Sequence, residues 1–261
     1  MNYLKTKDIF ERFALVNKHF YQLTLDTGSI KYLQVKNIGG NLSKHENMMK
    51  VLSRCKTLIE FSIEDIFCDE YQFMSCIIKA LESSQKLKSL KILTKCYVTL
   101  GTRFHFGGLN SKFLNFLEKS KDKLENIEFE DVRFTHEVLD IICKMKNLKR
   151  LAIKRNLIFS NFIENLANSE NQLETIELHQ KFSYPHQEED KALNKLLSKK
   201  QDTLKSIILT NLGCCPILTK SYFPKLENIY LCSWQAQARL ETKHLEEFVV
   251  QSKNLKSIEF D

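Results

Sequence analysis

The sequence predicts an α/β fold, a right-handed solenoid of about nine repeats that follows an N-terminal helical segment. Two observations lead to this prediction. A six-residue phrase recurs nine times: an aliphatic residue, two variable residues, an aliphatic residue, one variable residue and an apolar residue. Between copies, the apolar spacing changes to that of amphipathic helices. The copies begin at Ile30, Leu58, Leu87, Leu124, Leu148, Leu173, Leu204, Leu226 and Leu255.

Each copy of the phrase is expected to form a short parallel strand. The fourth and sixth positions, Ile127 and Phe129 in the fourth copy, point to one face, whereas Asn126 and Glu128 point to the other. One strand cannot bury its apolar side alone, so the stacked strands must share a continuous core. Strand, loop, helix and return make one right-handed turn, with strands on the concave side and helices on the convex side.

Four segments between the phrases are expected to be helical, because their apolar residues recur at helical intervals. Thr135 is a good N-cap for one of them, and Glu137 in its first turn suits the positive end of a helix. The other three segments are residues 72–84, 111–120 and 242–251. Each would cover the strands of its own repeat.

One stretch carries a family resemblance. Residues 124–148, LENIEFEDVRFTHEVLDIICKMKNL, resemble the cysteine-containing subclass of leucine-rich repeats, LxxLxLxxCxxITDxxLxxIxxxCxxL. Phe134, Thr135, Leu139 and Ile142 are in register with that pattern, while Val132 stands at its first cysteine position. The resemblance implies a leucine-rich-repeat domain over residues 30–261 that binds another protein.

Residues 1–29 do not fit the repeat and are expected to form two short helices. The string YLKTKDIFERFALVNKHFYQLTLD resembles the later two thirds of an F-box, with Phe20 where that family usually has Trp. The family's opening helix, which begins with Leu-Pro and an acidic residue, has no counterpart in the sequence. The alternative is that this segment only caps the end of the solenoid.

The combined resemblance, to F-box proteins with leucine-rich repeats, implies the substrate-recognition subunit of an SCF-type ubiquitin ligase. Its partners would be a Skp-type adaptor, the cullin ligase subunits and an unidentified protein substrate. The adaptor-binding residues would be Phe10, Leu15, Val16, Phe20 and Leu23. The alternative is a repeat scaffold or adaptor protein with no role in ubiquitin transfer.

The protein target is expected on the concave face, at the third and fifth positions of the phrase, and on two long loops. Arg150, Ile208 and Tyr230 are the expected anchors, because Arg and Tyr are frequent in binding hot spots. The same positions would also fit an inert polar face, and the loop aromatics would also fit a small core under each loop. The candidates are Tyr32, Lys91, Glu128, Arg150, Glu177, Ile208 and Tyr230 on the face, with Phe104 and Tyr184 in the loops.

The second positions of the phrase alternate in charge from the third copy onward. On adjacent strands, each Lys would lie between two Glu. This pattern indicates lateral ion pairs that stabilise the sheet more than it indicates a recognition stripe. The residues are Lys88, Glu125, Lys149, Glu174, Lys205, Glu227 and Lys256.

Composition and missing motifs exclude several classes of function. The net charge of +7 is spread along the chain, and the concave positions show no basic patch, which disfavours a nucleic-acid groove. The eight cysteines form no CxxC pair, so we expect no metal site. No nucleophile or phosphate-binding motif occurs, so we expect no catalytic residues and no cofactor. The absence of a secretory signal and of long apolar runs predicts a cytoplasmic or nuclear protein without membrane contact.

Overall fold

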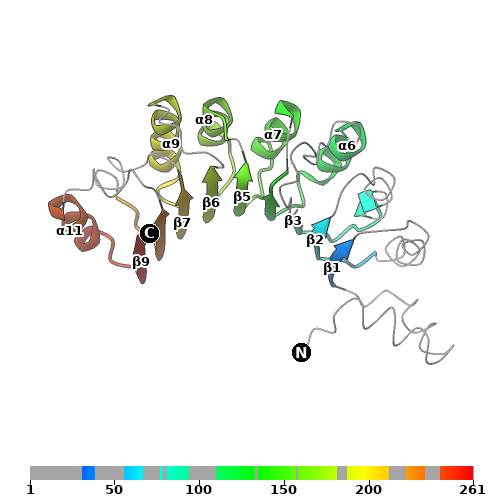
Figure 1. Ribbon diagram of the computed structural model, residues 1–261, viewed down its shortest axis with the longest axis horizontal. Coiled ribbons are helices and arrows are strands. Elements are labelled where there is room, and N and C mark those ends of the chain that lie inside the picture. Colours follow the sequence, from blue (N-terminus) through cyan, green and yellow to red (C-terminus); the bar gives the residue numbers. More distant parts are fainter. Residues whose placement is uncertain are drawn as a thin grey trace. The chain divides into compact units, whose positions relative to one another are not determined.

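The computed structural model describes residues 31–38, 56–66, 77–78, 81–93, 110–132, 135–156, 158–180, 187–211, 222–232 and 242–260. The architecture is α/β, with an open sheet of nine parallel strands in the order β1 to β9 and with short helices (Figure 1). The strands are β1 (Tyr32–Ile38), β2 (Glu60–Ile66), β3 (Ser89–Leu93), β4 (Asn126–Glu130), β5 (Arg150–Asn156), β6 (Thr175–Gln180), β7 (Ser206–Thr210), β8 (Asn228–Cys232) and β9 (Ser257–Phe260). The helices are α6 (Asn110–Ser120), α7 (His136–Cys143), α8 (Ser160–Asn168), α9 (Gln187–Lys200) and α11 (Thr242–Gln251).

The chain forms two compact units. The first ends at Leu124 and takes in Asp131–Phe134, and the second contains Glu125–Glu130 and Thr135–Asp261. Strands β1 to β3 and helix α6 belong to the first unit, whereas β4 to β9 and the remaining helices belong to the second. The expected boundary between residues 29 and 30 lies outside the described residues.

Every strand begins at the third residue of a copy of the phrase. The phrase also fixes how neighbouring strands pair. In the second unit, the backbone carbonyl of Glu125 accepts hydrogen bonds from the amides of Lys149 and Arg150, and the carbonyl of Lys149 accepts from Glu174 and Thr175. The same pair of bonds recurs between later strands and, in the first unit, between β1, β2 and β3. Equivalent positions of the phrase therefore face each other across the sheet.

The core lies on the side of the strands that carries the fourth and sixth positions. Ile127, Phe129, Leu151, Leu178 and Ile207 are completely buried. The first positions from Leu58 to Leu226 are buried as well, which confirms that they pack where the chain enters each strand. Burial of a side chain of this size contributes roughly 1.5–3 kcal/mol. Figure 1 shows α7, α8 and α9 along this one side of strands β5 to β7.

The helices expected over residues 111–120, after Thr135 and over 242–251 are confirmed. Most of the segment 72–84 lies outside the described residues, although positions 77–78 and 81–82 are helical. Thr135 is the N-cap residue of α7, but its side chain makes no capping hydrogen bond. Two further helices, α8 and α9, were not expected. Each buries apolar residues that occur in adjacent pairs, which in α8 are Phe162 with Ile163 and Leu166 with Ala167.

Helix α9 is joined to the end of α8 by a buried lysine. The ammonium of Lys200 donates hydrogen bonds to the backbone carbonyls of Ser169, at 2.6 Å, and Asn171, at 2.9 Å. These carbonyls follow the C-terminus of α8, where a positive charge is favourable. Burial lowers the pKa of Lys200. Lys200 therefore supplies hydrogen-bond donors to backbone carbonyls that follow the last turn of α8 and have no helical N–H partner.

A left-handed backbone residue occurs at the eighth position of three copies of the phrase, directly after β4 and β7 and near the end of β5. Asp131, Arg155 and Asn211 have φ of 56°, 54° and 58°. Asp and Asn adopt this conformation readily, whereas Arg155 adopts it at a cost of about 1 kcal/mol. The side-chain amide of Asn211 donates a hydrogen bond to the backbone carbonyl of Gln180 at 3.2 Å. The turn that follows β7 is thus hydrogen-bonded to the end of the neighbouring strand β6.

Candidate protein-binding face

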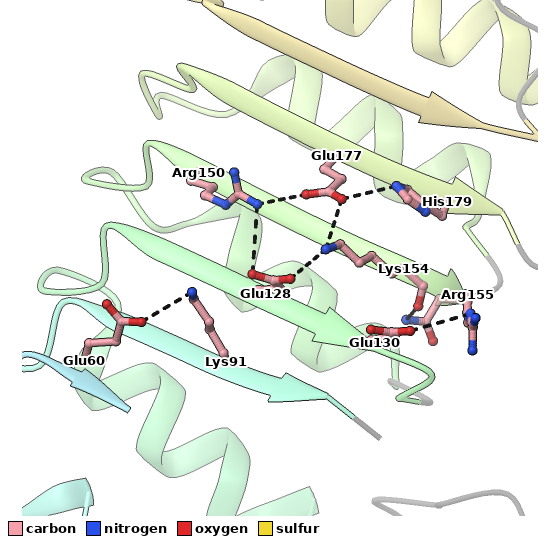
Figure 2. A network of polar contacts seen from close by, with 10 residues as sticks. Glu60, Lys91, Glu128, Glu130, Arg150, Lys154, Arg155, Glu177 and His179 are labelled. Atoms are coloured by element: carbon pink, nitrogen blue, oxygen red, sulfur yellow. Dashed lines mark hydrogen bonds and ion pairs between the residues drawn. The ribbon is translucent and has the colours of Figure 1, made fainter. Parts of the chain in front are cut away.

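The face of the strands opposite the core carries the variable positions of the phrase. In the second unit, strands β4, β5 and β6 present alternating charged residues there, and these side chains point toward one another (Figure 2). Because successive residues of a strand point to opposite faces, the same strands bury Ile127 and Leu151 on the other side. This surface is called the open face below.

Four charged side chains form a closed ring on the open face. The Lys154 ammonium lies 2.7 Å from a Glu128 oxygen and 3.0 Å from a Glu177 oxygen. The Arg150 guanidinium lies 2.8 Å from the other Glu177 oxygen and 3.9 Å from Glu128. Ala152, between the two cations on β5, is fully buried. Two carboxylates and two cations therefore neutralise one another across three strands.

Glu177 is the most deeply placed charge of the ring, with its side chain only 8% exposed. Burial by itself would raise the pKa of Glu177, because it disfavours the charged form. The contacts from His179 and Lys154 and the charge of Arg150 outweigh burial and hold this pKa at about 2. The pKa of Lys154 is raised: burial lowers it, but hydrogen bonds to Glu128 and Glu177 more than compensate. Both groups are therefore charged at neutral pH.

His179 stands at the edge of the ring. Its Nε2 lies 3.3 Å from Glu177. That atom is buried and has no aligned hydrogen bond to any residue that the structure describes, so the two groups are in close contact without a directed bond. Outside the ring, Arg155 lies 3.5 Å from Glu130, and its side chain remains largely exposed.

Strands β7 and β8 give the open face a different character. Ile208 pairs with Tyr230 in the sheet register, and Ser206 pairs with Asn228. Ile208 and Tyr230 are half-buried, and none of these four residues carries a charge. The second unit therefore has a self-neutralised charged region on β4 to β6 beside an uncharged, partly apolar region on β7 and β8.

In the first unit the corresponding face, opposite that unit's own core, is mostly polar. Lys91 lies 3.3 Å from Glu60, and the amide of Gln34 donates a hydrogen bond to Glu64. Ser62 is buried between them on β2. Tyr32 is 56% exposed, which makes it the largest open aromatic of this unit among the described residues.

The alternating charges at the second positions form lateral ion pairs, as the sequence predicts. The three pairs are Lys149–Glu125 at 3.0 Å, Lys205–Glu174 at 2.8 Å and Lys256–Glu227 at 2.7 Å. The hydrogen bond and charge of Glu174, with the charge of Glu227, raise the pKa of Lys205. Lys205 is therefore influenced by a Glu on each side.

The predicted site residues have different outcomes. Glu128, Arg150 and Glu177 meet in one network, Ile208 and Tyr230 are neighbours, and Tyr32 and Lys91 lie on the same face of the first unit. The seven remaining candidates lie outside the described residues: Phe10, Leu15, Val16, Phe20, Leu23, Phe104 and Tyr184.

Sequence reasoning missed Lys154 and His179. Both follow the sixth position of their phrase by one residue, where the strands β5 and β6 continue. Both residues lie one position beyond the six-residue phrase, but the alternation of exposed and buried residues continues through this seventh position. Extending each strand by one residue would have found both.

Two observations concern metal binding and thiol reactivity in the described part of the chain. No group of three or more His, Cys, Asp or Glu in the described ranges could hold a metal ion. Burial and, secondarily, the charge of Asp140 raise the pKa of the Cys143 thiol to about 12, so this thiol is not a nucleophile at neutral pH. None of the described helices is both long and apolar enough to span a membrane. No protein-family model matches the chain, and no curated protein matches it either.

Proposed function

We propose that the chain is a right-handed leucine-rich-repeat solenoid of about nine repeats that acts as the substrate-recognition subunit of an SCF-type ubiquitin ligase. Its open face would hold a protein target, and residues 1–29 would bind a Skp-type adaptor. Ubiquitin transfer would belong to other subunits, in the cytoplasm or the nucleus. The chain itself would carry no catalytic residue and no cofactor.

One observation carries the protein-binding part of this proposal. Nine strands begin at the same position of a repeated phrase, so within each unit the variable positions of neighbouring strands lie side by side on one face. From β2 to β8 the positions on the core side are apolar and buried, whereas those on the open face differ from strand to strand. A surface that the fold itself does not constrain is suited to recognition of a partner.

The charge pattern of the open face favours a protein over a nucleic acid. The cations Arg150, Lys154 and Arg155 are each within 4 Å of a carboxylate. Nucleic-acid binding requires cations that can release counterions from phosphates, and it would have to break these pairs. Uncharged Ile208 and Tyr230 next to the ring instead resemble the centre of a protein interface, where charged residues are depleted.

The ubiquitin-ligase part rests on the resemblance of residues 1–29 to an F-box, and it is tested by adaptor binding. Purified Skp-type adaptor is incubated with the full chain and with the double variant Val16→Asp/Phe20→Asp, followed by pull-down and titration calorimetry. We expect the wild type to bind and the variant to lose binding, because two charges would enter an apolar docking surface.

The matched control is Val250→Asp/Phe159→Asp, which makes the same two substitutions at side chains that are 78% and 41% exposed. Circular dichroism establishes that all three proteins are folded. Control binding equal to the wild type would support the proposal. A folded wild type that does not bind, even with an F-box first helix fused ahead of Met1, would contradict the ligase role and leave a leucine-rich-repeat scaffold without a role in ubiquitin transfer.

A further inference from the structure

A single row of side chains crosses four strands of the second unit on the open face. Glu177 of β6 pairs with Ile208 of β7, Ile208 pairs with Tyr230 of β8, and Tyr230 pairs with Glu259 of β9. The row thus reads acid, aliphatic, aromatic, acid. Neighbouring members are separated by the strand spacing of about 4.8 Å.

The two carboxylates at the ends of this row differ in their partners. Glu177 is buried and contacts Arg150, Lys154 and His179. Glu259 is exposed and forms no ion pair with any residue that the structure describes. The other carboxylates of this face on β4 and β6 each have a cation within 4 Å. Glu259 is therefore the carboxylate of the row that is available to a cation from outside.

The spacing of the row matches that of an extended peptide. The midpoint between Ile208 and Tyr230 lies one and a half strand spacings from Glu259, or about 7 Å. Residues i and i+2 of an extended chain point the same way and are also about 7 Å apart. An apolar side chain resting on Ile208 and Tyr230 would thus place a side chain two residues away over Glu259.

We propose that this row binds an extended segment of the target protein in which a large apolar residue and a Lys or Arg are separated by one residue. This inference rests on the proposed function of the open face and names the chemistry of its target. The apolar side chain buries surface on Ile208 and Tyr230, neither of which is charged. The basic side chain pairs with Glu259, which supplies specificity and register.

A peptide selection tests the proposal. Random twelve-residue peptides displayed on phage are selected on the full-length wild-type protein. We expect enrichment of peptides with a large apolar residue one position removed from Lys or Arg. The affinity of a selected peptide is then measured for Tyr230→Ala and Glu259→Lys, each of which should weaken it by about tenfold or more.

Charge reversal gives the sharper outcome. Replacing the peptide's basic residue by Glu should restore binding to Glu259→Lys and abolish it for the wild type. The matched control is Glu247→Lys, which reverses an exposed carboxylate of α11 and should leave peptide affinity unchanged. No enrichment, enrichment without a basic residue, or equal effects of Glu259→Lys and Glu247→Lys would each overturn the proposal.

The adaptor pull-down is repeated with Glu259→Lys to separate this inference from the proposed function. Loss of peptide binding with unchanged adaptor binding supports the row as the target site of a ligase subunit. If the wild type binds the adaptor but selects no such peptide, the proposed peptide site is rejected and the ligase role is retained. Peptide binding without adaptor binding rejects the ligase role and keeps the row.

Discussion

The two faces of the same strands follow different rules. On the core face of β7, Leu209 is 1% exposed and lies in a layer of Ile, Leu and Phe side chains. One residue earlier, Ile208 is half-buried on the open face among Ser, Tyr and Glu side chains. Packing against helices determines the first face, because a close-packed layer tolerates few shapes. The second face is free to vary, and it is there that recognition can differ from strand to strand.

The largest expected effect on stability distinguishes the two faces through substitutions at two neighbouring residues of β7. Leu209→Ala should lower the free energy of unfolding by about 2–5 kcal/mol, since it leaves a cavity in the core. Ile208→Ala removes the same number of carbon atoms but should lower it by about 1 kcal/mol, because solvent already reaches the side chain. Urea denaturation measures both. Equal losses would show that the open face is packed as tightly as the core.

The ring of charges is the part of the open face on which stability is expected to depend. Glu177→Gln removes the carboxylate that compensates Lys154 and Arg150 and should lower the free energy of unfolding by about 2–3 kcal/mol. The control, Glu247→Gln on the exposed surface of α11, should have no measurable effect. Urea denaturation of the two variants compares them directly, and a neutral Glu177→Gln would mean that the ring contributes nothing to folding.

Low pH should reduce the contribution of Glu177 to the free energy of unfolding. Its folded pKa of about 2 lies below the ordinary value of 4.5, so its stabilising effect is complete above the ordinary pKa and is lost as pH falls toward about 2. The stability difference between wild type and Glu177→Gln should therefore shrink by about 2 kcal/mol from about pH 7 to about pH 3. Urea denaturation at both pH values gives this difference, and a constant value would refute the assigned pKa.

The smallest effect is expected from the lateral ion pairs at the second positions. Lys205→Glu places a carboxylate between Glu174 and Glu227 and should lower the urea midpoint slightly. Adding Glu174→Lys should restore part of the loss, because Glu227 still faces a like charge. The effect should fade in about 1 M salt, which screens exposed charges. A loss that salt leaves unchanged would point to packing instead of charge.

Much of this fold could be predicted because apolar residues recur at fixed positions of each repeat. The presence of a strand in each copy, the burial of the first, fourth and sixth positions from β2 to β8, and the Lys205–Glu174 type of pair all follow from the period of the phrase. Helices α8 and α9 were not expected, although both carry apolar residues in adjacent pairs four residues apart. Start signals were present but were not used: Ser160 and Asn161 at the start of α8, and the acidic first turn of α9.

The sequence by itself determined which residues of a strand share a face, because alternation along an extended chain is local. It also indicated that Glu128, Arg150 and Glu177 belong to one surface. Tertiary structure decided that Arg150 and Lys154 both reach Glu177, and that Glu259 remains without a cation among the described residues. Such pairings depend on the lateral register of separate strands and on the reach of long side chains across a gap of about 4.8 Å. Residues distant in the chain acquire their charge state and their availability to a partner only when the strands are side by side.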